Sequence, residues 1–215
     1  MRLRITFSKS GMLRYTGHLD LHRLWERTCR RANISLKYSQ GFHPKPRISL
    51  GSALPLGFIG MAELIDIKLD EDRDPESVRN KLQNAAPPGL EISSIEIIDP
   101  KLPALQTQIE SAEYQVEFLD PVDSTKLDKR LTTIDQAESI PRIRKGKSYD
   151  LRPLILSMNL EEHPERDYPV LSIRLKAAPG ATGRPEEVLA EMGILPEDSR
   201  ITRTKLNLLE IERVS

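Results

Sequence analysis

The chain begins with the stretch Arg2-Leu3-Arg4-Ile5-Thr6-Phe7-Ser8, in which polar and apolar side chains alternate. A period of two residues is typical of a β-strand with one face in a hydrophobic core and the other face in solvent. The polar face of this stretch is basic. The pattern therefore predicts a strand that presents Arg2 and Arg4 to solvent.

The segments that follow predict the remaining elements of the first half. Residues 17–33 place apolar side chains at helical spacing, and residues 75–85 predict a second helix with proline near its first turn. Residues 63–69 and 90–98 have the period of strands. With a strand region before residue 63, the order is that of the βαββαβ unit, an antiparallel sheet with both helices on one face.

The second half of the chain repeats this order after a linker-like stretch at residues 99–103. The elements that we expect there are strands at 112–119, 170–177 and 201–211, helices at 124–137 and 185–192, and a hairpin over 142–160 that turns at Lys145-Gly146-Lys147. We therefore predict an α+β fold of two tandem ferredoxin-like halves with antiparallel sheets, the first at residues 1–103 and the second at residues 104–215.

Length and composition limit the class of protein. The chain has 215 residues, which is enough for one large domain or for two of about 100 residues. Its apolar and charged contents, 38% and 30%, are those of a soluble globular protein. The single cysteine, Cys29, excludes an internal disulfide framework. The first residues lack the apolar core of a signal peptide, so we expect a cytoplasmic protein with no membrane partner.

The net charge of zero conceals an uneven distribution. Residues 1–60 contain eleven lysines and arginines against two acids, a net charge of +9, whereas residues 61–140 contain eight against eighteen acids, a net charge of −10. We therefore expect the first sixty residues to form an anion-seeking surface. Pairing of this basic segment with the acidic one is the alternative that the composition leaves open.

The segment of most unusual composition is residues 37–47, which we call the arch. It contains Gly41-Phe42-His43-Pro44-Lys45-Pro46-Arg47 and is followed by an uncharged run over residues 48–62. Each proline fixes its own φ angle and biases the preceding residue towards extended backbone, so we expect a stiff, non-helical loop that presents its side chains to a ligand. The uncharged run reads either as a strand and turn packed in the core or as a hairpin that docks on a partner.

Several stretches resemble one bacterial family. They are Arg14-Tyr15-Thr16-Gly17-His18-Leu19-Asp20, residues 38–49, Leu54-Pro55-Leu56-Gly57, and Lys145-Gly146-Lys147 followed by Asp150-Leu151-Arg152-Pro153. The pattern is similar to the radical SAM-linked protein family, a domain of unknown function that stands alone or is joined to a cobalamin-binding radical SAM protein. His43 and Lys45 depart from it, since the family often has asparagine and histidine there. A role that requires an imidazole at residue 43 is therefore not implied.

The resemblance implies an accessory role. The chain lacks the CxxxCxxC pattern of a radical SAM iron–sulfur site, and a single cysteine cannot ligate such a cluster. The radical chemistry would therefore belong to a partner radical SAM protein. We expect no cofactor in this chain.

The basic end of the chain favours RNA, single-stranded or structured, as the ligand. Phosphate contacts by Lys and Arg, with aromatic stacking on bases, are the physical ingredients of single-stranded RNA recognition. We predict a non-catalytic RNA-binding or substrate-presenting accessory of a radical SAM enzyme that acts in RNA modification. Its predicted nucleic-acid-binding residues are Arg2, Arg4, Arg23, Arg27, Lys37, Phe42, His43, Lys45, Arg47, Lys145 and Lys147.

Two other functions would use the same surface. Metal-independent endoribonucleases of the CRISPR repeat-processing type share a tandem ferredoxin-like fold, and in such an enzyme His18 and His22 would supply acid or base catalysis. A protein-interaction module would instead dock the basic face on an acidic partner. His18, His22 and Cys29 could share a helix side with His43 nearby, but the spacing matches no compact zinc motif, and we predict no metal site.

The basic turn at Lys145-Gly146-Lys147 lies among Arg142, Arg144 and Arg152. A long basic hairpin inserts into an RNA groove or grips the acidic face of a partner protein. A solvated loop that protects an edge strand is the plain structural alternative. We expect the side chains of Asp150 and Arg152 to pair and to fix the base of the hairpin.

Overall fold

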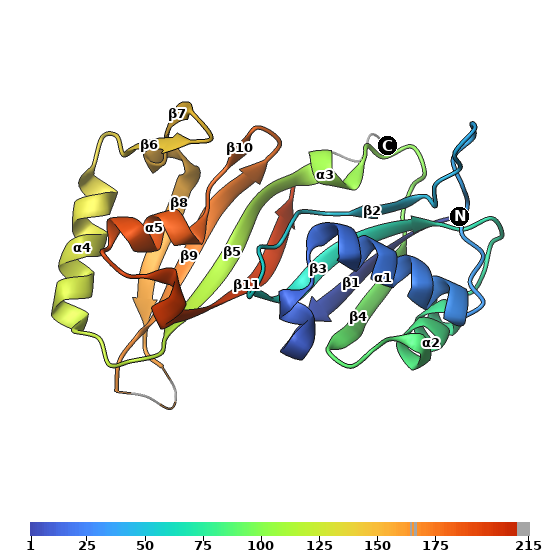
Figure 1. Ribbon diagram of the computed structural model, residues 1–215, viewed down its shortest axis with the longest axis horizontal. Coiled ribbons are helices and arrows are strands. Elements are labelled where there is room, and N and C mark those ends of the chain that lie inside the picture. Colours follow the sequence, from blue (N-terminus) through green and yellow to red (C-terminus); the bar gives the residue numbers. More distant parts are fainter. Residues whose placement is uncertain (164, 166, 210–215) are drawn as a thin grey trace. The chain divides into compact units, whose positions relative to one another are not determined.

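A computed structural model of the protein describes residues 1–163, 165 and 167–209 (Figure 1). The chain divides into two compact units. Unit 1 comprises Met1–Ile109 together with Leu209, and unit 2 comprises Glu110–Leu208. Within the described residues, no helix has the length and apolar character needed to span a membrane.

Unit 1 contains a four-stranded antiparallel sheet and two main helices. The strands lie in the order β4, β1, β3, β2, and every neighbouring pair is antiparallel. The elements in chain order are β1 (Arg2–Lys9), the 3-10 helix η1 (Gly11–Tyr15), α1 (His18–Arg31), β2 (Ile48–Leu50), β3 (Ile59–Lys68), α2 (Pro75–Ala85), β4 (Leu90–Ile97) and the short α3 (Leu105–Gln108).

Both helices of unit 1 pack into one core with the apolar face of β1. Leu3, Ile5 and Phe7 of that strand share a buried cluster with Trp25 of α1 and Leu82 of α2. The rings of Phe7 and Trp25 meet edge to face, with their centroids 5.0 Å apart. The alternating pattern at the start of the chain therefore does build a strand with one face in the core.

The opposite face of β1 is not open to solvent, and this corrects the sequence-based expectation. Arg2 and Arg4 are almost fully buried, and both bind the buried carboxylate of Asp66 on β3. Arg2 also donates hydrogen bonds to the carbonyls of Leu102 and Pro103, at 2.6 and 2.9 Å. The prediction that these two arginines lie on an exposed basic face is therefore wrong, because the chain returns after β4 and covers them.

Asp66 accepts from both guanidinium groups. Its Oδ1 accepts from Nε of Arg4 at 2.8 Å, and its Oδ2 accepts from Nη2 of Arg2 at 2.7 Å. Arg4 and Asp66 are also register partners across the β1–β3 pair. Gln108 completes the network by accepting from Nη2 of Arg4 at 3.1 Å and donating to the carbonyl of Pro103 at 2.6 Å. The buried charges are thus paired and hydrogen-bonded, which is the condition under which burial of charge is tolerated.

In unit 2, β11 pairs with β5, β5 with β9, and β9 with both β8 and β10. Its elements are β5 (Ile109–Phe118), α4 (Ser124–Gln136), β6 (Pro141–Arg144), β7 (Lys147–Asp150), η2 (Arg152–Leu154), β8 (Ile155–Glu161), β9 (Val170–Ala178), β10 (Ala181–Thr182), α5 (Pro185–Glu191), η3 (Pro196–Asp198) and β11 (Ser199–Leu208).

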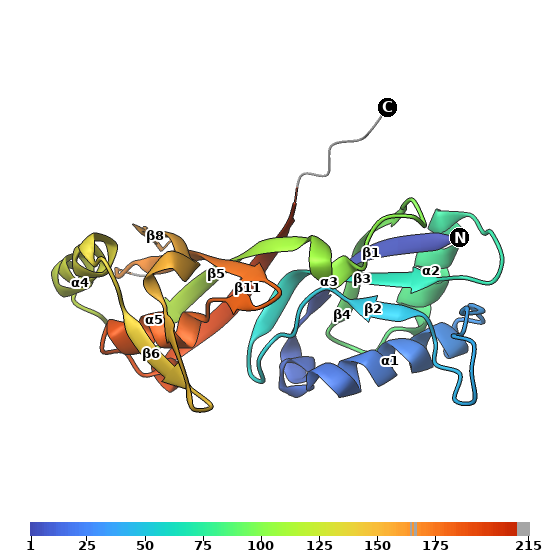
Figure 2. The ribbon, with the colours of Figure 1, turned by 90° about the horizontal axis from the view of Figure 1, so that it is seen from above.

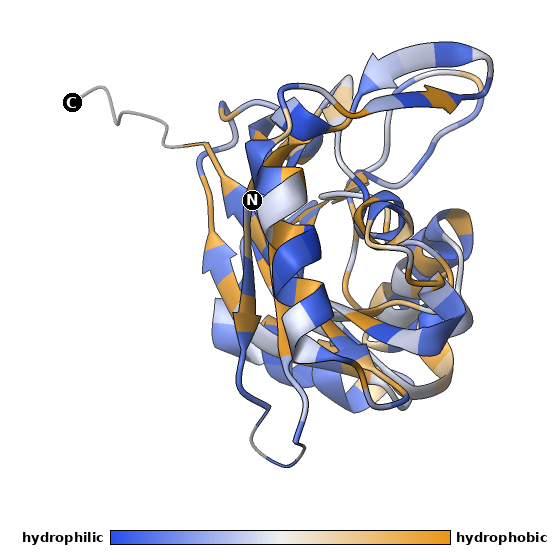
Figure 3. Ribbon diagram, turned by 90° about the vertical axis from the view of Figure 1, so that its left-hand side faces the viewer, coloured by the Kyte–Doolittle hydropathy of each residue, from blue (hydrophilic) through white to orange (hydrophobic). Residues whose placement is uncertain are grey.

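Local sequence signals account for the helices of unit 2. The Asp123 carboxylate accepts from the backbone N–H of Lys126 at 3.1 Å and caps α4, as Asp74 caps α2 through the N–H of Ser77. Figure 3 shows α4 with hydrophobic bands between hydrophilic ones, and its buried side chains are Leu127, Leu131 and Ile134. This pattern is that of a surface helix with one apolar face.

The α+β class and the order of strands and helices are confirmed. The expected hairpin over 142–160 differs in detail, because only β6 and β7 form it, as a separate two-stranded sheet, while β8 joins the main sheet of unit 2. The uncharged run contributes β2 and the start of β3, and Leu54 and Phe58 within it are buried. The last strand ends at Leu208, and residues 210–211 of the expected strand lie outside the described residues.

Replacement of Asp66 by alanine tests the buried network. The substitution leaves two guanidinium groups buried without their carboxylate, so we expect the free energy of unfolding of unit 1 to fall by about 3–5 kcal/mol. Urea unfolding followed by the fluorescence of Trp25, the single tryptophan, measures this change. Asp70→Ala is the matched control, since Asp70 is exposed and its loss should change stability by less than about 0.5 kcal/mol. Equal effects of the two substitutions would contradict the role of the network.

Candidate nucleic-acid interface

The arch forms a narrow, hydrogen-bonded loop between α1 and β2 (Figure 1). Tyr38 and Pro46 face each other in an antiparallel bridge. The N–H of Ser39 donates to the carbonyl of Lys45 at 2.8 Å, and the N–H of Lys45 returns a bond to Ser39 Oγ at 2.9 Å. These bonds hold the two arms of the loop together, so the expectation of a stiff, non-helical segment agrees with its geometry.

The root of the arch is tied to the sheet of unit 1. The N–H of Arg47 donates to the carbonyl of Lys37 at 2.8 Å, and the N–H of Lys37 donates to the carbonyl of Lys68 at 2.8 Å. Lys68 in turn donates its N–H to the carbonyl of Arg47 at 3.0 Å. Three cationic residues therefore meet at the root through their backbones. Lys68 was missed by the sequence analysis, because only the register of β3 brings this residue beside the arch.

The tip of the arch exposes an aromatic ring. Gly41 adopts φ = 129°, a conformation that glycine tolerates and that lets the chain reverse at this point. The next residue, Phe42, is fully exposed to solvent, and His43 is also exposed. Tyr38, on the flank of the loop, is about half exposed, at 48%. An exposed phenyl ring on a constrained loop is available for stacking on a flat ligand.

The cations of the arch are exposed and lack acidic partners in the described part of the chain. Lys37, Lys45 and Arg47 are exposed, and none of them forms an ion pair there. The alternative that the acidic segment neutralises these residues therefore finds no support at the arch. The arch combines three available positive charges with an aromatic tip.

The cations of α1 lie in two hollows of unit 1. Arg23 and Arg27 line one of about 410 Å³, where Arg23 makes a loose ion pair of 3.4 Å with Asp20. Arg30 lines another of about 300 Å³ together with Tyr38 of the arch. Glu26 and Asp70 line the same hollow as Arg30, so this hollow does not extend the basic surface of the arch. Arg23 and Arg27 belong to a separate patch along the helix.

The histidines at the start of α1 do not join the arch. His18 is the first residue of α1, His22 follows one turn later, and the arch begins beyond the end of this 14-residue helix (Figure 2). At 1.5 Å per residue the helix separates its two ends by about 20 Å. His43 follows the C-terminal end of α1, whereas His18 and His22 lie at its N-terminal end, so the helix gives no support to a shared metal site of the kind that the spacing left open.

Cys29 lies in the core of unit 1, where burial raises the pKa of its thiol to about 12. A protonated, buried thiol is a poor metal ligand. The described residues contain no group of three or more histidines, cysteines or carboxylates arranged to hold a metal ion.

The β6–β7 hairpin carries the second basic loop. Its turn residues Lys145 and Gly146 have φ angles of 48° and 75°, as a tight two-residue hairpin turn of the primed type requires. Ile143, Lys145 and Lys147 are exposed along it. The loop therefore presents two of its predicted binding lysines to solvent.

Asp150 fixes the root of this hairpin through backbone hydrogen bonds. Its Oδ1 accepts from the N–H of Ile140 at 2.7 Å and from the N–H of Arg152 at 3.0 Å, and these bonds hold the pKa of its carboxyl below the usual value. The expected pair between the Asp150 and Arg152 side chains is wrong, because the Arg152 guanidinium binds Asp135 at 2.9 Å instead.

Helix α5 anchors the strands of the same hairpin. Arg142 on β6 pairs with Glu191, and the Tyr149 hydroxyl on β7 donates to Glu187. Burial, together with the hydrogen bond to Glu187, raises the pKa of Tyr149 to about 12. Arg142 and Tyr149 therefore hold the hairpin in place and are not free to bind a ligand.

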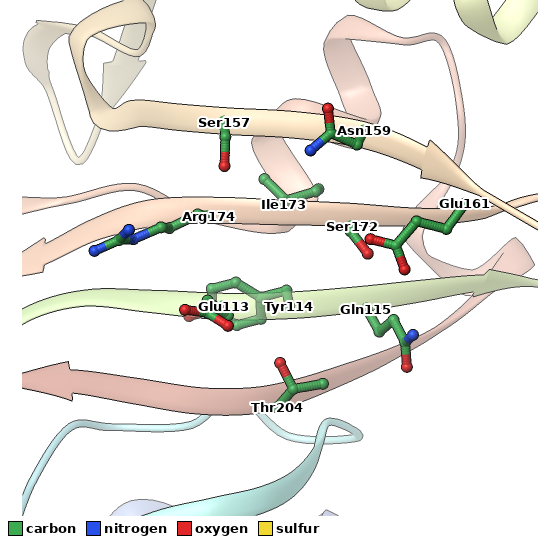
Figure 4. Close-up of a pocket in the computed structure, with 10 residues that line it drawn as sticks. All are labelled: Glu113, Tyr114, Gln115, Ser157, Asn159, Glu161, Ser172, Ile173, Arg174 and Thr204. Atoms are coloured by element: carbon green, nitrogen blue, oxygen red, sulfur yellow. The ribbon is translucent and has the colours of Figure 1, made fainter.

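Unit 2 also has a polar hollow on one face of its sheet (Figure 4). The hollow encloses about 270 Å³ and is lined by side chains from four strands, among them Glu113, Glu161 and Arg174. Asn207 donates to Glu113 at 2.8 Å beside it. Two carboxylates against one guanidinium make this surface unsuited to a polyanion, so the basic loops are the stronger candidates for nucleic acid.

The geometry defines a class of protein, an α+β protein of two units. Unit 1 carries a basic arch that is hydrogen-bonded to β3, and unit 2 carries a basic hairpin that is anchored on α5. Residues 2–185 match the model of the family described as "Uncharacterized protein conserved in bacteria (DUF2344)", and the chain belongs to that family. A search of curated proteins finds no match.

Comparison with solved structures finds two similar chains. The crystal structure of a Cbf5-Nop10-Gar1 complex contains a chain that is 11% identical with a TM-score of 0.51, over 98% of this chain and 50% of that one. The archaeal box H/ACA sRNP Nop10-Cbf5 complex contains one that is 10% identical with a TM-score of 0.47, over the same shares. The chain thus spans about half the length of the solved chains it matches, and at this identity the first likeness concerns the fold alone.

The anchor of the β6–β7 hairpin predicts a pH dependence. Because the pKa of Tyr149 is raised from 10.0 to about 12, the stabilisation from its neutral hydroxyl is complete below pH 10 and is lost as the pH rises towards 12. Tyrosinate absorbance after a rapid pH jump should contain one component with a midpoint near pH 12, and Tyr149→Phe should remove it. If Tyr149→Phe instead removes a component with a midpoint near pH 10, the hydroxyl of Tyr149 does not anchor the hairpin as described.

Proposed function

We propose that this protein is a non-catalytic RNA-binding accessory, and that the arch is its principal contact with single-stranded RNA. The observation that carries the proposal is the fully exposed Phe42, which lies among Lys37, Lys45 and Arg47 on a hydrogen-bonded loop. In this arrangement the three cations bind phosphates and the ring stacks on a base. His43, the next residue along the loop, is also exposed and contacts the same base or its sugar.

The chemistry of the arch favours a single strand over a duplex. Sequence-specific RNA recognition depends largely on unpaired bases that stack on aromatic or guanidinium groups, whereas the bases of a duplex are already stacked on each other. A phenyl ring at the tip of a narrow loop requires an accessible base face. Single-stranded or looped RNA is therefore the ligand class that the tip and flanks of the arch fit together.

A radical SAM protein is the proposed partner. The resemblance of residues 14–20, 38–49 and 54–57 to the radical SAM-linked family supports this part of the proposal. With one buried cysteine, this chain lacks the three thiolates that such an iron–sulfur site requires. We propose that the chain binds and presents RNA while the partner performs the modification. The likeness to a chain of the Cbf5-Nop10-Gar1 complex is compatible with this role but supports the fold alone.

We also propose that each unit is a ferredoxin-like repeat. In unit 1 the first, second, third and fourth main strands are β1, β2, β3 and β4, and their spatial order is β4, β1, β3, β2. In unit 2 the corresponding strands are β5, β8, β9 and β11, and their order is β11, β5, β9, β8. The two orders are the same, with the β6–β7 hairpin and β10 as additions to unit 2. This agreement supports an internal duplication of the βαββαβ unit.

The first test removes the charges of the arch. The triple substitution Lys37→Ala, Lys45→Ala, Arg47→Ala should weaken binding of a labelled oligouridine by at least about tenfold at moderate salt, because three phosphate contacts are lost. The slope of log affinity against log salt should fall in magnitude by about 2, since each contact to a single strand contributes about 0.7. Fluorescence anisotropy over a salt series measures both quantities.

A matched triple variant controls for net charge. Lys81→Ala, Lys101→Ala, Lys129→Ala removes three exposed lysines that form no ion pair among the described residues, and its affinity and salt slope should equal those of the unaltered chain. Equal losses in the two triple variants would show that binding follows net charge alone and would refute a site at the arch.

The second test removes the aromatic ring. Phe42→Ala should weaken RNA binding by about 1–3 kcal/mol, the usual contribution of one base stacked on an aromatic side chain. Phe42→Leu keeps an apolar side chain without a π-face and should lose nearly as much, whereas Phe42→Trp should retain binding. The salt slope should stay the same in all three variants, because no charge changes. Binding of Phe42→Ala at full strength would rule out a stacked base at this residue.

A further inference from the structure

The two basic loops occupy the same place in the order of elements. The arch connects α1, the first main helix of unit 1, to β2, and the β6–β7 hairpin lies between α4, the first helix of unit 2, and β8. β2 pairs antiparallel with the next strand β3, and β8 pairs antiparallel with the next strand β9. Each loop therefore leaves its unit at the connection from the first helix to an outer strand.

The two loops also share their construction. Each is an antiparallel pair of arms, closed by the Tyr38–Pro46 bridge in the arch and by the Pro141–Asp150 register in the hairpin. Each turns with the help of a glycine at positive φ, Gly41 or Gly146. A rigid projection at this connection is thus a repeated feature of the two units.

Both loops carry cations without acidic partners in the described part of the chain. The arch has three such cations, and the hairpin also has three, Arg144, Lys145 and Lys147. Arg142 is the exception on the hairpin, because it pairs with Glu191 and holds the loop on α5. An exposed apolar side chain lies at each loop, Phe42 in one and Ile143 in the other.

We propose that the β6–β7 hairpin is a second RNA-binding site, and that the chain grips one RNA strand at two points, once with each unit. This inference rests on the proposed function, since it assigns RNA to the hairpin by the same chemistry as to the arch. Two linked contacts of modest strength bind a long strand far more tightly than a short one, because the second contact is intramolecular. The hairpin thus extends the RNA footprint of the protein from one unit to both.

The two sites have different tasks. Tyr149, the aromatic residue of the hairpin, has its hydroxyl bound to Glu187 in the root, and the exposed Ile143 has no π-face for a base. The hairpin therefore holds the phosphate backbone through Arg144, Lys145 and Lys147 without base stacking. Backbone contacts of this kind carry no sequence information, whereas the arch adds a stacked base.

The test compares two RNA lengths with matched variants. The probes are a labelled oligouridine of about 6 nucleotides, which fits one site, and one of about 24 nucleotides, which is longer than a single site of up to about 16 nucleotides. The hairpin variant combines Arg144→Ala, Lys145→Ala and Lys147→Ala. It retains Arg142, because this residue anchors the hairpin on α5. The control is again Lys81→Ala, Lys101→Ala, Lys129→Ala. All substituted side chains are solvent-accessible, and circular dichroism verifies that each variant is folded.

The unaltered chain should bind the long RNA about 100-fold more tightly than the short one. The hairpin variant should reduce this ratio to below about tenfold and lower the salt slope for the long RNA by about 2, while its affinity for the short RNA changes less than about threefold. The control variant should keep the full ratio.

Three results would overturn the proposal, and they separate its failure from that of the proposed function. If the hairpin variant keeps the full length ratio while the arch variant loses RNA binding, the hairpin site is refuted and the proposed function stands. If the unaltered chain binds neither RNA, the proposed function fails with it. If the chain prefers polyglutamate of matched charge to RNA and the hairpin variant loses that preference, the hairpin binds an acidic protein instead.

Discussion

The structure of unit 1 depends on the buried ion pairs that the carboxylate of Asp66 forms. The carboxylate binds Arg2 and Arg4 from the neighbouring strand β1, and residues 102–108 accept further hydrogen bonds from these two arginines. Removal of the carboxylate would leave two guanidinium groups buried and unpaired, and removal of the guanidinium groups would leave the carboxylate so. Proteins rarely tolerate a buried charge without its partner. The network therefore locks the β1–β3 register and withdraws two arginines from the surface. The cations of unit 1 that remain for a ligand lie mainly on the arch and on α1.

Local signals in the sequence determine much of the fold. Helix α2 spans Pro75–Ala85 as its pattern predicts, since Asp74 caps it and proline occupies its first turn. The polar face of β1 shows the limit of such patterns. Alternation indicates that Arg2 and Arg4 lie on the face opposite Leu3, but it cannot indicate what covers that face. The covering segment is about a hundred residues away in the sequence, and only the fold brings it there.

The same distinction applies to the candidate site. Two prolines predict a stiff arch, and the side chains of Phe42 and Lys45 are exposed as a ligand-binding loop requires. His18 and His22 lie near the arch in sequence, yet α1 separates them from it along its length. Lys68 escaped notice for the opposite reason, since it is distant in sequence and reaches the arch only through backbone hydrogen bonds. Charge counts in a sequence cannot tell an exposed cation such as Lys147 from an anchor such as Arg142.

We propose that RNA contacts this protein at the aromatic tip of the arch. Ultraviolet crosslinking to RNA in cells, followed by trypsin digestion and mass spectrometry of nucleotide-bearing peptides, tests it most directly. Trypsin cleaves after Lys37 and Arg47 but not between Lys45 and Pro46, so residues 38–47 are released as one peptide that contains Phe42 and His43. We expect a nucleotide adduct on this peptide. Adducts confined to other peptides, such as those of α1 or of the strands that line the polar hollow of unit 2, would contradict the proposed contact at the arch.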